Sequence, residues 1–249
     1  MSRRLWWLTA FAALFVAFSA APALAQSVTL DLGGDAGGSS TGRIIQLLLL
    51  LTVLSLAPAI LVTVTSFTRI IVVLSFLRNA LGLQQTPPNI VLISLALFLT
   101  GFIMAPTLEK SYDNGIAPLI AEKLPEQEAL TRAAAPLHDF MIAHVRERDL
   151  QLFTGLAKLG PVATPSAVPY RVLMPAFMIS ELRRSFEIGF LLFLPFLIID
   201  LVVSSILMSM GMMMLPPVTI SLPFKLIFFV LVDGWYLVAG SLVRSFGTG

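Results

Sequence analysis

The stretch 190-FLLFLPFLIIDLVVSSILMSMGMMMLPP-217 decides how the rest of the chain is organised. Apolar residues dominate from Ile188 to Leu215, and Asp200 is the only charged residue among them. A run of this length is long enough to cross a bilayer as a helix. A carboxylate in the middle of such a run is costly in lipid, so we expect it to face protein or water. The stretch closes in a methionine cluster and two prolines, which are expected to stop the helix.

The composition is that of a polytopic membrane protein. Hydrophobic residues make up 57% of the chain, charged residues only 12%, and the mean hydropathy is +0.91. The net charge of +2 is too small to indicate nucleic acid binding. The chain has no cysteine, which excludes disulfides, zinc–thiolate sites, iron–sulfur clusters and cysteine nucleophiles. It also lacks the nucleotide-binding, zinc-protease and serine-hydrolase motifs, so the sequence predicts no catalytic residues and no cofactor.

Residues 1–25 are predicted to be a secretory signal peptide. Arg3 and Arg4 form its positive start, an apolar core follows, and Ala23-Leu24-Ala25 matches a cleavage site before Gln26. An uncleaved first helix is the alternative, and the two arginines also suggest a twin-arginine signal. A cleaved signal places the mature N-terminus outside the cytoplasm of a bacterium. The next segment, 26–43, is rich in glycine and serine and is predicted to be a flexible leader.

Residues 44–108 form the first predicted hydrophobic helical hairpin. The apolar run is too long for one straight crossing, and Pro58 is the expected break. The first crossing is expected to extend to about Thr65, and an amphipathic helix carrying Arg69 and Arg78 should follow it. These positive charges place the turn on the cytoplasmic side. The return arm is expected to stop at Pro106.

Residues 109–187 are predicted to form a water-exposed helical insert on the periplasmic side. This segment holds nine Lys or Arg residues, ten Asp or Glu residues and both histidines. Residues 188–249 then form a second hydrophobic hairpin whose arms are joined by the methionine-rich loop. The expected fold class is all-α, a polytopic membrane protein of about four broken hydrophobic helices in hairpins with a helical periplasmic insert.

Three charged residues lie in the apolar segments of the second hairpin, namely Asp200, Lys225 and Asp233. A charge at membrane depth is a functional candidate by default. We interpret Asp200 and Lys225 as a packing pair, formed within the chain or between subunits. A proton relay is the alternative, but no chain of further acids or histidines connects the two. Asp200 and Asp233 could form an aspartyl dyad, yet neither has the glycine-flanked setting expected of one.

Two other features have competing interpretations. His138 and His144 are six residues apart, so on a helix they point to different sides, and solvated surface is favoured over a metal site. The methionines near residue 210 could be adaptable core filler. Five of them in seven residues at a helix end is dense for filler, so a gating role is the favoured interpretation.

Two blocks of sequence resemble the FliP family, the export-gate component of flagellar type III secretion, whose injectisome relatives are the SctR proteins. They are 175-PAFMISELRRSFEIGF-190 and 223-PFKLIFFVLVDGW-235, and the segment 67-FTRIIVVLSFLRNALGLQQTPPN-89 is similar too. With the methionine-rich loop, the resemblance covers nearly all of residues 44–245. The predicted signal peptide favours the flagellar branch of the family.

The resemblance implies that several copies of the chain assemble with FliQ-like and FliR-like subunits into a closed, helically arranged gate. An FlhB-like switch protein would contact this gate, and unfolded flagellar subunits would be its cargo. Much of the assembly would rise out of the inner membrane toward the periplasm, so the apolar arms would pack on neighbours as well as on membrane lipid. The loop matches the methionine gasket of the family, with the gasket residues Met208, Met210, Met212, Met213 and Met214.

Subunit contacts are expected at the charged face of the first block, which holds Glu181, Arg183, Arg184 and Glu187. Residues three apart on a helix share a face, and truncating one partner of a buried pair leaves the other charge unpaired. Within the gate, the three intramembrane charges can be satisfied between subunits. The alternative functions are a secondary transporter or ion channel subunit, which would require inverted repeats that the sequence does not show, and a structural membrane scaffold.

Overall fold

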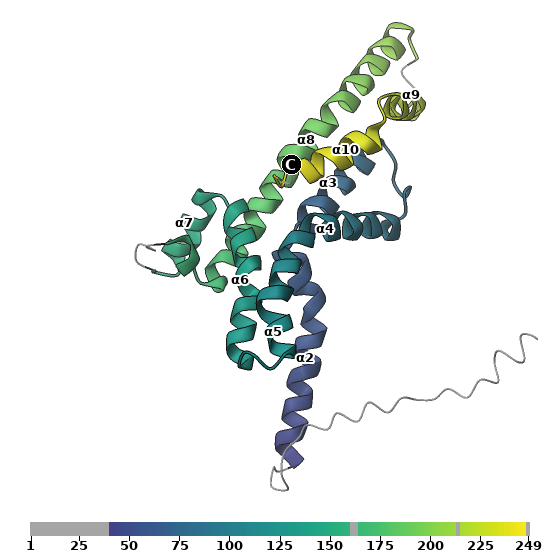
Figure 1. Cartoon of the computed structure of the whole chain (residues 1–249). Helices are drawn as coiled ribbons and strands as arrows, with labels where there is room; N and C mark the ends of the chain where they lie inside the picture. Colours follow the sequence, from purple (N-terminus) through teal and green to yellow (C-terminus); the bar gives the residue numbers. More distant parts are fainter. Residues whose placement is uncertain (1–39, 160–163, 213–214, 248–249) are drawn as a thin grey trace, which may run out of the picture. The chain divides into compact units, whose positions relative to one another are not determined.

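The computed structural model describes residues 40–159, 164–212 and 215–247, and within these ranges the chain is built of helices and turns without a strand (Figure 1). It divides into two compact units, residues 1–51 and 52–249. The described part of the first unit is the beginning of α2 (Ser40–Val64). All packing described below lies within the second unit. The all-α fold class predicted from the sequence is confirmed.

Helix α3 (Phe67–Ala80) lies at the centre of the larger core, between α8 (Tyr170–Ser209) and α4 (Asn89–Ser111). Its apolar residues recur with the helical period, and Ile70, Val73, Leu74 and Leu77 are fully buried. This confirms the amphipathic helix predicted for the segment.

A glycine sets how closely α3 and α8 approach each other. A Cβ atom on Gly189 of α8 would lie 2.6 Å from the ring of Phe76 on α3. No real Cβ contact is that short, so any larger residue here would push the two helices apart. Phe76 also packs edge-on against Phe186, one turn earlier on α8.

Helix α8 is 40 residues long and continues through Pro175 and Pro195. The predicted boundary between the insert and the second hairpin, at residues 187 and 188, therefore falls inside one unbroken helix. The last part of the insert and the first arm of the second hairpin both belong to α8 (Figure 1). The sequence suggested a boundary because charge density drops there, but a change in polarity along a helix does not end it.

The rest of the insert is a set of short helices packed on α4 and on the beginning of α8. A second cluster of buried residues, including Met141, Leu173 and Phe177, holds α6 and the beginning of α8 together. The elements are the π-helical turn η1 (Tyr112–Ile116), α5 (Ala117–Ile120), α6 (Glu126–His144), α7 (Glu147–Leu156) and the 3₁₀ turn η2 (Pro165–Ala167).

Two sharp bends break the apolar segments, and neither lies at an interior proline. The segments before and after Thr65 and Ser66 meet at 81°, and α9 (Pro217–Leu231) meets α10 (Gly234–Arg244) at 63°. The expected break at Pro58 and the expected stop at Pro106 were wrong, because α2 and α4 continue through them. A proline removes only one backbone hydrogen bond of the helix, so the helix can continue past it.

The described residues contain two helices long and apolar enough to cross a membrane, and up to four spans if each bent pair counts as one. The two helical segments are Asn89–Ile120 and Tyr170–Ser209. This agrees with the predicted number of broken hydrophobic helices.

Candidate functional site

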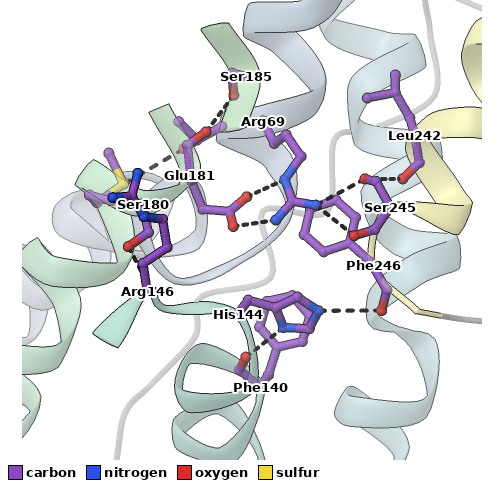
Figure 2. A network of polar contacts seen from close by, with 12 residues as sticks. Arg69, Phe140, His144, Arg146, Ser180, Glu181, Ser185, Leu242, Ser245 and Phe246 are labelled. Atoms are coloured by element: carbon purple, nitrogen blue, oxygen red, sulfur yellow. Dashed lines mark hydrogen bonds and ion pairs between the residues drawn. The ribbon is translucent and has the colours of Figure 1, made fainter. Parts of the chain in front are cut away.

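A buried ion pair between Arg69 of α3 and Glu181 of α8 lies at the centre of a network of polar contacts (Figure 2). Both side chains are fully excluded from solvent. The Nε atom of Arg69 donates to Oε2 of Glu181 at 2.7 Å, and Nη2 donates to the other carboxylate oxygen. Two parallel bonds of this kind fix orientation as well as distance. The pair therefore sets the register of α3 against α8.

The same guanidinium holds the turn that follows α10. Its Nη1 atom donates to the carbonyl and the hydroxyl oxygens of Ser245, both at 2.9 Å. Its centre lies 3.6 Å from the centroid of the Phe246 ring, a cation–π contact. Arg69 thus joins three segments that are distant in sequence.

Helix α6 reaches this turn through His144. The imidazole lies between the carbonyl oxygens of Phe140, 2.7 Å from Nδ1, and Phe246, 3.3 Å from Nε2 (Figure 2). The rings of Phe140 and Phe246 stack on each other beside it. His138 is buried elsewhere, 2.8 Å from the carbonyl oxygen of Val168. Neither histidine is the solvated surface residue that the sequence favoured.

The break between α6 and α7 is also tied to α8. The hydroxyl of Ser180 donates to Oδ2 of Asp149 at 2.7 Å and accepts from the backbone N–H of Arg146 at 3.0 Å. Arg146 in turn lies 3.6 Å from Asp149. Ser180 therefore binds the break between α6 and α7, while the next residue, Glu181, binds α3.

Glu181 differs from the other members of the predicted interface. It is fully buried and paired within the chain, which removes it from the surface available to a partner. Arg183 and Glu187 are exposed and bind each other, with Nε and Oε1 2.9 Å apart. Arg184 is half-buried and lines a polar pocket, which we call the arginine pocket. Its lining residues are Arg69, Arg146, Arg183, Arg184, Glu187, Ile188 and Ser245.

Asp200 and Lys225 form a second ion pair, between α8 and α9. Their charged atoms lie 2.7 Å apart, and the Lys225 side chain is 4% exposed against 25% for Asp200. Lys225 also donates to the carbonyl oxygen of Ala80, in the last turn of α3, where a cation is favourable. The hydroxyl of Ser221 donates to the other oxygen of Asp200. Pairing within the chain is one of the two packing arrangements that the sequence suggested.

The methionine-rich loop lies between Asp200 and Lys225 in the sequence. Helix α8 ends at Ser209, Gly211 takes a left-handed backbone conformation with φ 71°, and α9 starts at Pro217. The side chains of Met208, Met210 and Met212 are 62%, 55% and 45% exposed. Met213 and Met214 lie outside the described residues. The three described thioethers therefore make little contact with the rest of the chain.

Asp233 marks the bend between α9 and α10. It precedes α10 in a left-handed conformation with φ 51°, which Asp and Asn tolerate better than most residues. Its carboxylate is exposed and makes no side-chain capping bond. The three charges in the apolar segments are therefore not equivalent, because Asp200 and Lys225 form an ion pair while the carboxylate of Asp233 is exposed.

The sequence pointed to the pair of Asp200 and Lys225 but not to the pair of Arg69 and Glu181. Arg69 was interpreted as a marker of membrane sidedness, and Glu181 as an interface residue. One signal was available, because Arg69 is the only charge in the apolar run from residue 44 to 77 and faces the same side as Ile70 and Val73. A charge on the core face of a helix requires a buried partner.

We predict that exchanging the charges of the second pair restores what the single changes lose. Lys225→Asp alone puts two carboxylates together between α8 and α9, and we expect little folded protein. The double variant Asp200→Lys/Lys225→Asp should recover most of the yield. Yield is measured by size-exclusion chromatography of detergent extracts. A double variant that is recovered no better than Lys225→Asp alone would show that the two residues do not act as a pair.

The fold and these sites define an all-helical membrane protein in which ion pairs are buried between broken apolar helices. The model of the FliP family matches residues 50–242. The chain is 60% identical to the flagellar biosynthetic protein FliP of Caulobacter vibrioides, over 97% of this chain and 91% of that protein. It is 54% identical to the FliP protein of Agrobacterium fabrum, over 84% and 86% of the two chains. The FliP protein of Bacillus subtilis is 56% identical, over 81% and 91%.

The chain belongs to the FliP family, as its resemblance in sequence suggested. Its role is therefore in flagellar biosynthesis, and it is a membrane protein.

Proposed function

We propose that this protein is a pore-forming core subunit of the flagellar type III export gate, which passes unfolded flagellar subunits across the inner membrane. The observation that carries the proposal is the exposed methionine side chains of the loop between α8 and α9. The pair of Asp200 and Lys225 joins these two helices. Methionine has three rotatable bonds and a polarizable sulfur, so several copies converging on an axis can close against one another. They can also reform around a passing chain of varied side chains.

Exposed apolar surface supports an assembly of several chains. Large side chains along α8, α9 and α10 are more than half exposed in the single chain, among them Phe190, Leu201, Val230 and Tyr236. Helices interrupted at the bends and loops are tolerated at membrane depth where they are covered by protein or line a cavity. We therefore expect neighbouring copies, together with FliQ-like and FliR-like subunits and an FlhB-like switch protein, to cover part of this surface, with lipid covering the rest.

The test is export in a strain whose own copy of the gene is deleted. Expression of this chain should restore swimming and the appearance of flagellar subunits in the culture medium. Affinity purification from the same cells should recover FliQ-like and FliR-like proteins with it. A transporter or channel subunit would purify without them, and that result would overturn the proposal.

The topology that we propose has a cleaved signal peptide, a mature N-terminus outside the cytoplasm and the insert in the periplasm. The motif Ala23-Leu24-Ala25, which lies outside the described residues, predicts a mature chain that begins at Gln26. Intact mass measurement of the membrane form checks this. A chain that retains residues 1–25 would contradict both the cleavage and the outward N-terminus.

A further inference from the structure

Arg184 stands out in the arginine pocket, which has a volume of about 440 Å³. The other three arginines that line the pocket each have an acid within the chain. Arg69 binds Glu181, Arg146 lies beside Asp149, and Arg183 binds Glu187. Arg184 has no hydrogen bond or ion pair to any of the residues that the structure describes, although it is half-buried. A guanidinium in this setting is a binding site for a carboxylate or phosphate from another molecule.

Asp233 is the matching group of opposite charge. Its side chain has no hydrogen bond or ion pair in the described parts of the chain, and its neighbours in sequence are apolar and exposed. Leu231 is 78% exposed and Tyr236 is 71% exposed. Whatever covers these side chains also removes water from the carboxylate. A carboxylate in such surroundings is costly unless a cation accompanies it.

The two charges are unable to meet within one chain. Ser245, which lines the arginine pocket, follows the last residue of α10, whereas Asp233 precedes its first residue. The 11 residues of α10 separate the two ends by about 16 Å. In Figure 1, α10 extends from the middle of α8 toward α9, which places its two ends in different parts of the molecule.

We propose that Arg184 of one copy of this chain binds Asp233 of the next copy. The proposal rests on the assembly of several copies put forward above. A guanidinium and a carboxylate can form two parallel hydrogen bonds, and both charges are neutralised as the apolar faces around them are covered. Because the two residues lie on different parts of the surface, the contact is head to tail and can repeat from copy to copy.

Charge reversal tests the pairing. Arg184→Glu should reduce the recovered oligomer several-fold, and Asp233→Arg should do the same. The double variant Arg184→Glu/Asp233→Arg should restore most of it, because the pair is remade with its signs exchanged. Arg171→Glu, at an exposed arginine of the same helix, is the control and should assemble normally. Asp233→Asn removes the charge but suits the left-handed backbone, so it separates loss of the pair from misfolding.

Cross-linking gives a second test that does not depend on the amount of oligomer recovered. The chain has no native cysteine, so only the introduced cysteines can react. The double variant Arg184→Cys/Asp233→Cys, treated in membranes with a short bis-maleimide, should form a ladder of dimers, trimers and larger species. Each single-cysteine variant should remain monomeric on the denaturing gel. Dimers from a single-cysteine variant would mean that one face meets itself, which overturns the head-to-tail pairing.

The remaining outcomes separate this inference from the proposed function. If both charge reversals assemble and support export, the pairing is wrong while the export gate stands. If the wild-type chain forms no oligomer at all, both fail. If Arg184→Glu leaves the oligomer unchanged but lowers the amount of anionic phospholipid that co-purifies, the pocket holds a lipid headgroup and the pairing is overturned.

Discussion

Glu181→Ala is expected to prevent the accumulation of folded protein. The change leaves the guanidinium of Arg69 in a fully buried position with its charge uncompensated. Breaking a buried pair in this way costs about 3–5 kcal/mol. Native proteins are stable by only about 5–15 kcal/mol, so a loss of this size removes a large share of the total. The measurements are the amount of monodisperse protein in detergent extracts and its resistance to limited proteolysis.

Glu187→Ala is the matched control, because it removes the same group from the same helix. Its pair with Arg183 is more than half exposed on both sides, and exposed pairs contribute about 0–1 kcal/mol. We expect this variant to accumulate normally. The double variant Arg69→Met/Glu181→Leu should be recovered better than Glu181→Ala, since it leaves no buried charge. Equal yields of Glu181→Ala and Glu187→Ala would show that the buried pair does not hold α3 on α8.

Replacing Met208, Met210 and Met212 together by alanine is expected to leave the assembly intact and to make the closed gate leak small ions. The three side chains are largely exposed, so their loss creates no cavity in the packed core. If copies of this loop converge on the pore axis, the variant shortens three of the five methionines that each copy would contribute to its closure. We expect a several-fold increase in ion flux through liposomes that contain the purified complex, or a fall in membrane potential in cells.

The matched control replaces the same three methionines by leucine, which keeps their volume but not their flexibility. This variant should stay closed to ions, and we expect it to export subunits more slowly than the wild type. An assembled alanine variant that holds ions as well as the wild type would mean that the narrowest point of the pore lies elsewhere. Complex formation is checked in parallel by size-exclusion chromatography.

Local patterns in the sequence predicted the elements of this fold well. The apolar stripe of α3 was readable because its period matches the helix, and the core face proved to be buried. The prolines were misleading, because α2 continues through Pro58 and α4 through Pro106 although both prolines are exposed. The first observed break falls at Thr65 and Ser66, where the first crossing was expected to end, and the second falls at Asp233; no interior proline marks either of them. Such bends depend on tertiary packing, which the helix propensities of individual residues do not predict.

The sequence predicted a candidate site where its charged residues are isolated within apolar runs, and missed it where they lie among other charges. Asp200 and Lys225 are single charges in apolar runs, and only 25 residues separate them. Arg69 and Glu181 are 112 residues apart, and Glu181 lies in a block crowded with other charges. Nothing in the order of residues distinguishes the buried acid of that block from the exposed Glu187. The difference comes from the direction of each side chain once α8 packs against α3.

The 40 residues of α8 span about 60 Å, roughly twice the thickness of the hydrocarbon core of a bilayer. One end is fastened to the insert and to α3, and the other end carries the methionines. Pro195 lies between the two ion pairs and leaves the carbonyl of Leu191 without its helical hydrogen bond, so the helix bends most easily there. The two halves of α8 can therefore tilt relative to each other at Pro195. A tilt of about 10° there would displace the C-terminal end of α8, about 20 Å away, by about 4 Å, roughly the width of one side chain. In the export gate proposed above, a small change of this bend would move the methionines of each copy and so change the width of the opening, without any change in the core formed by α3 and the first half of α8.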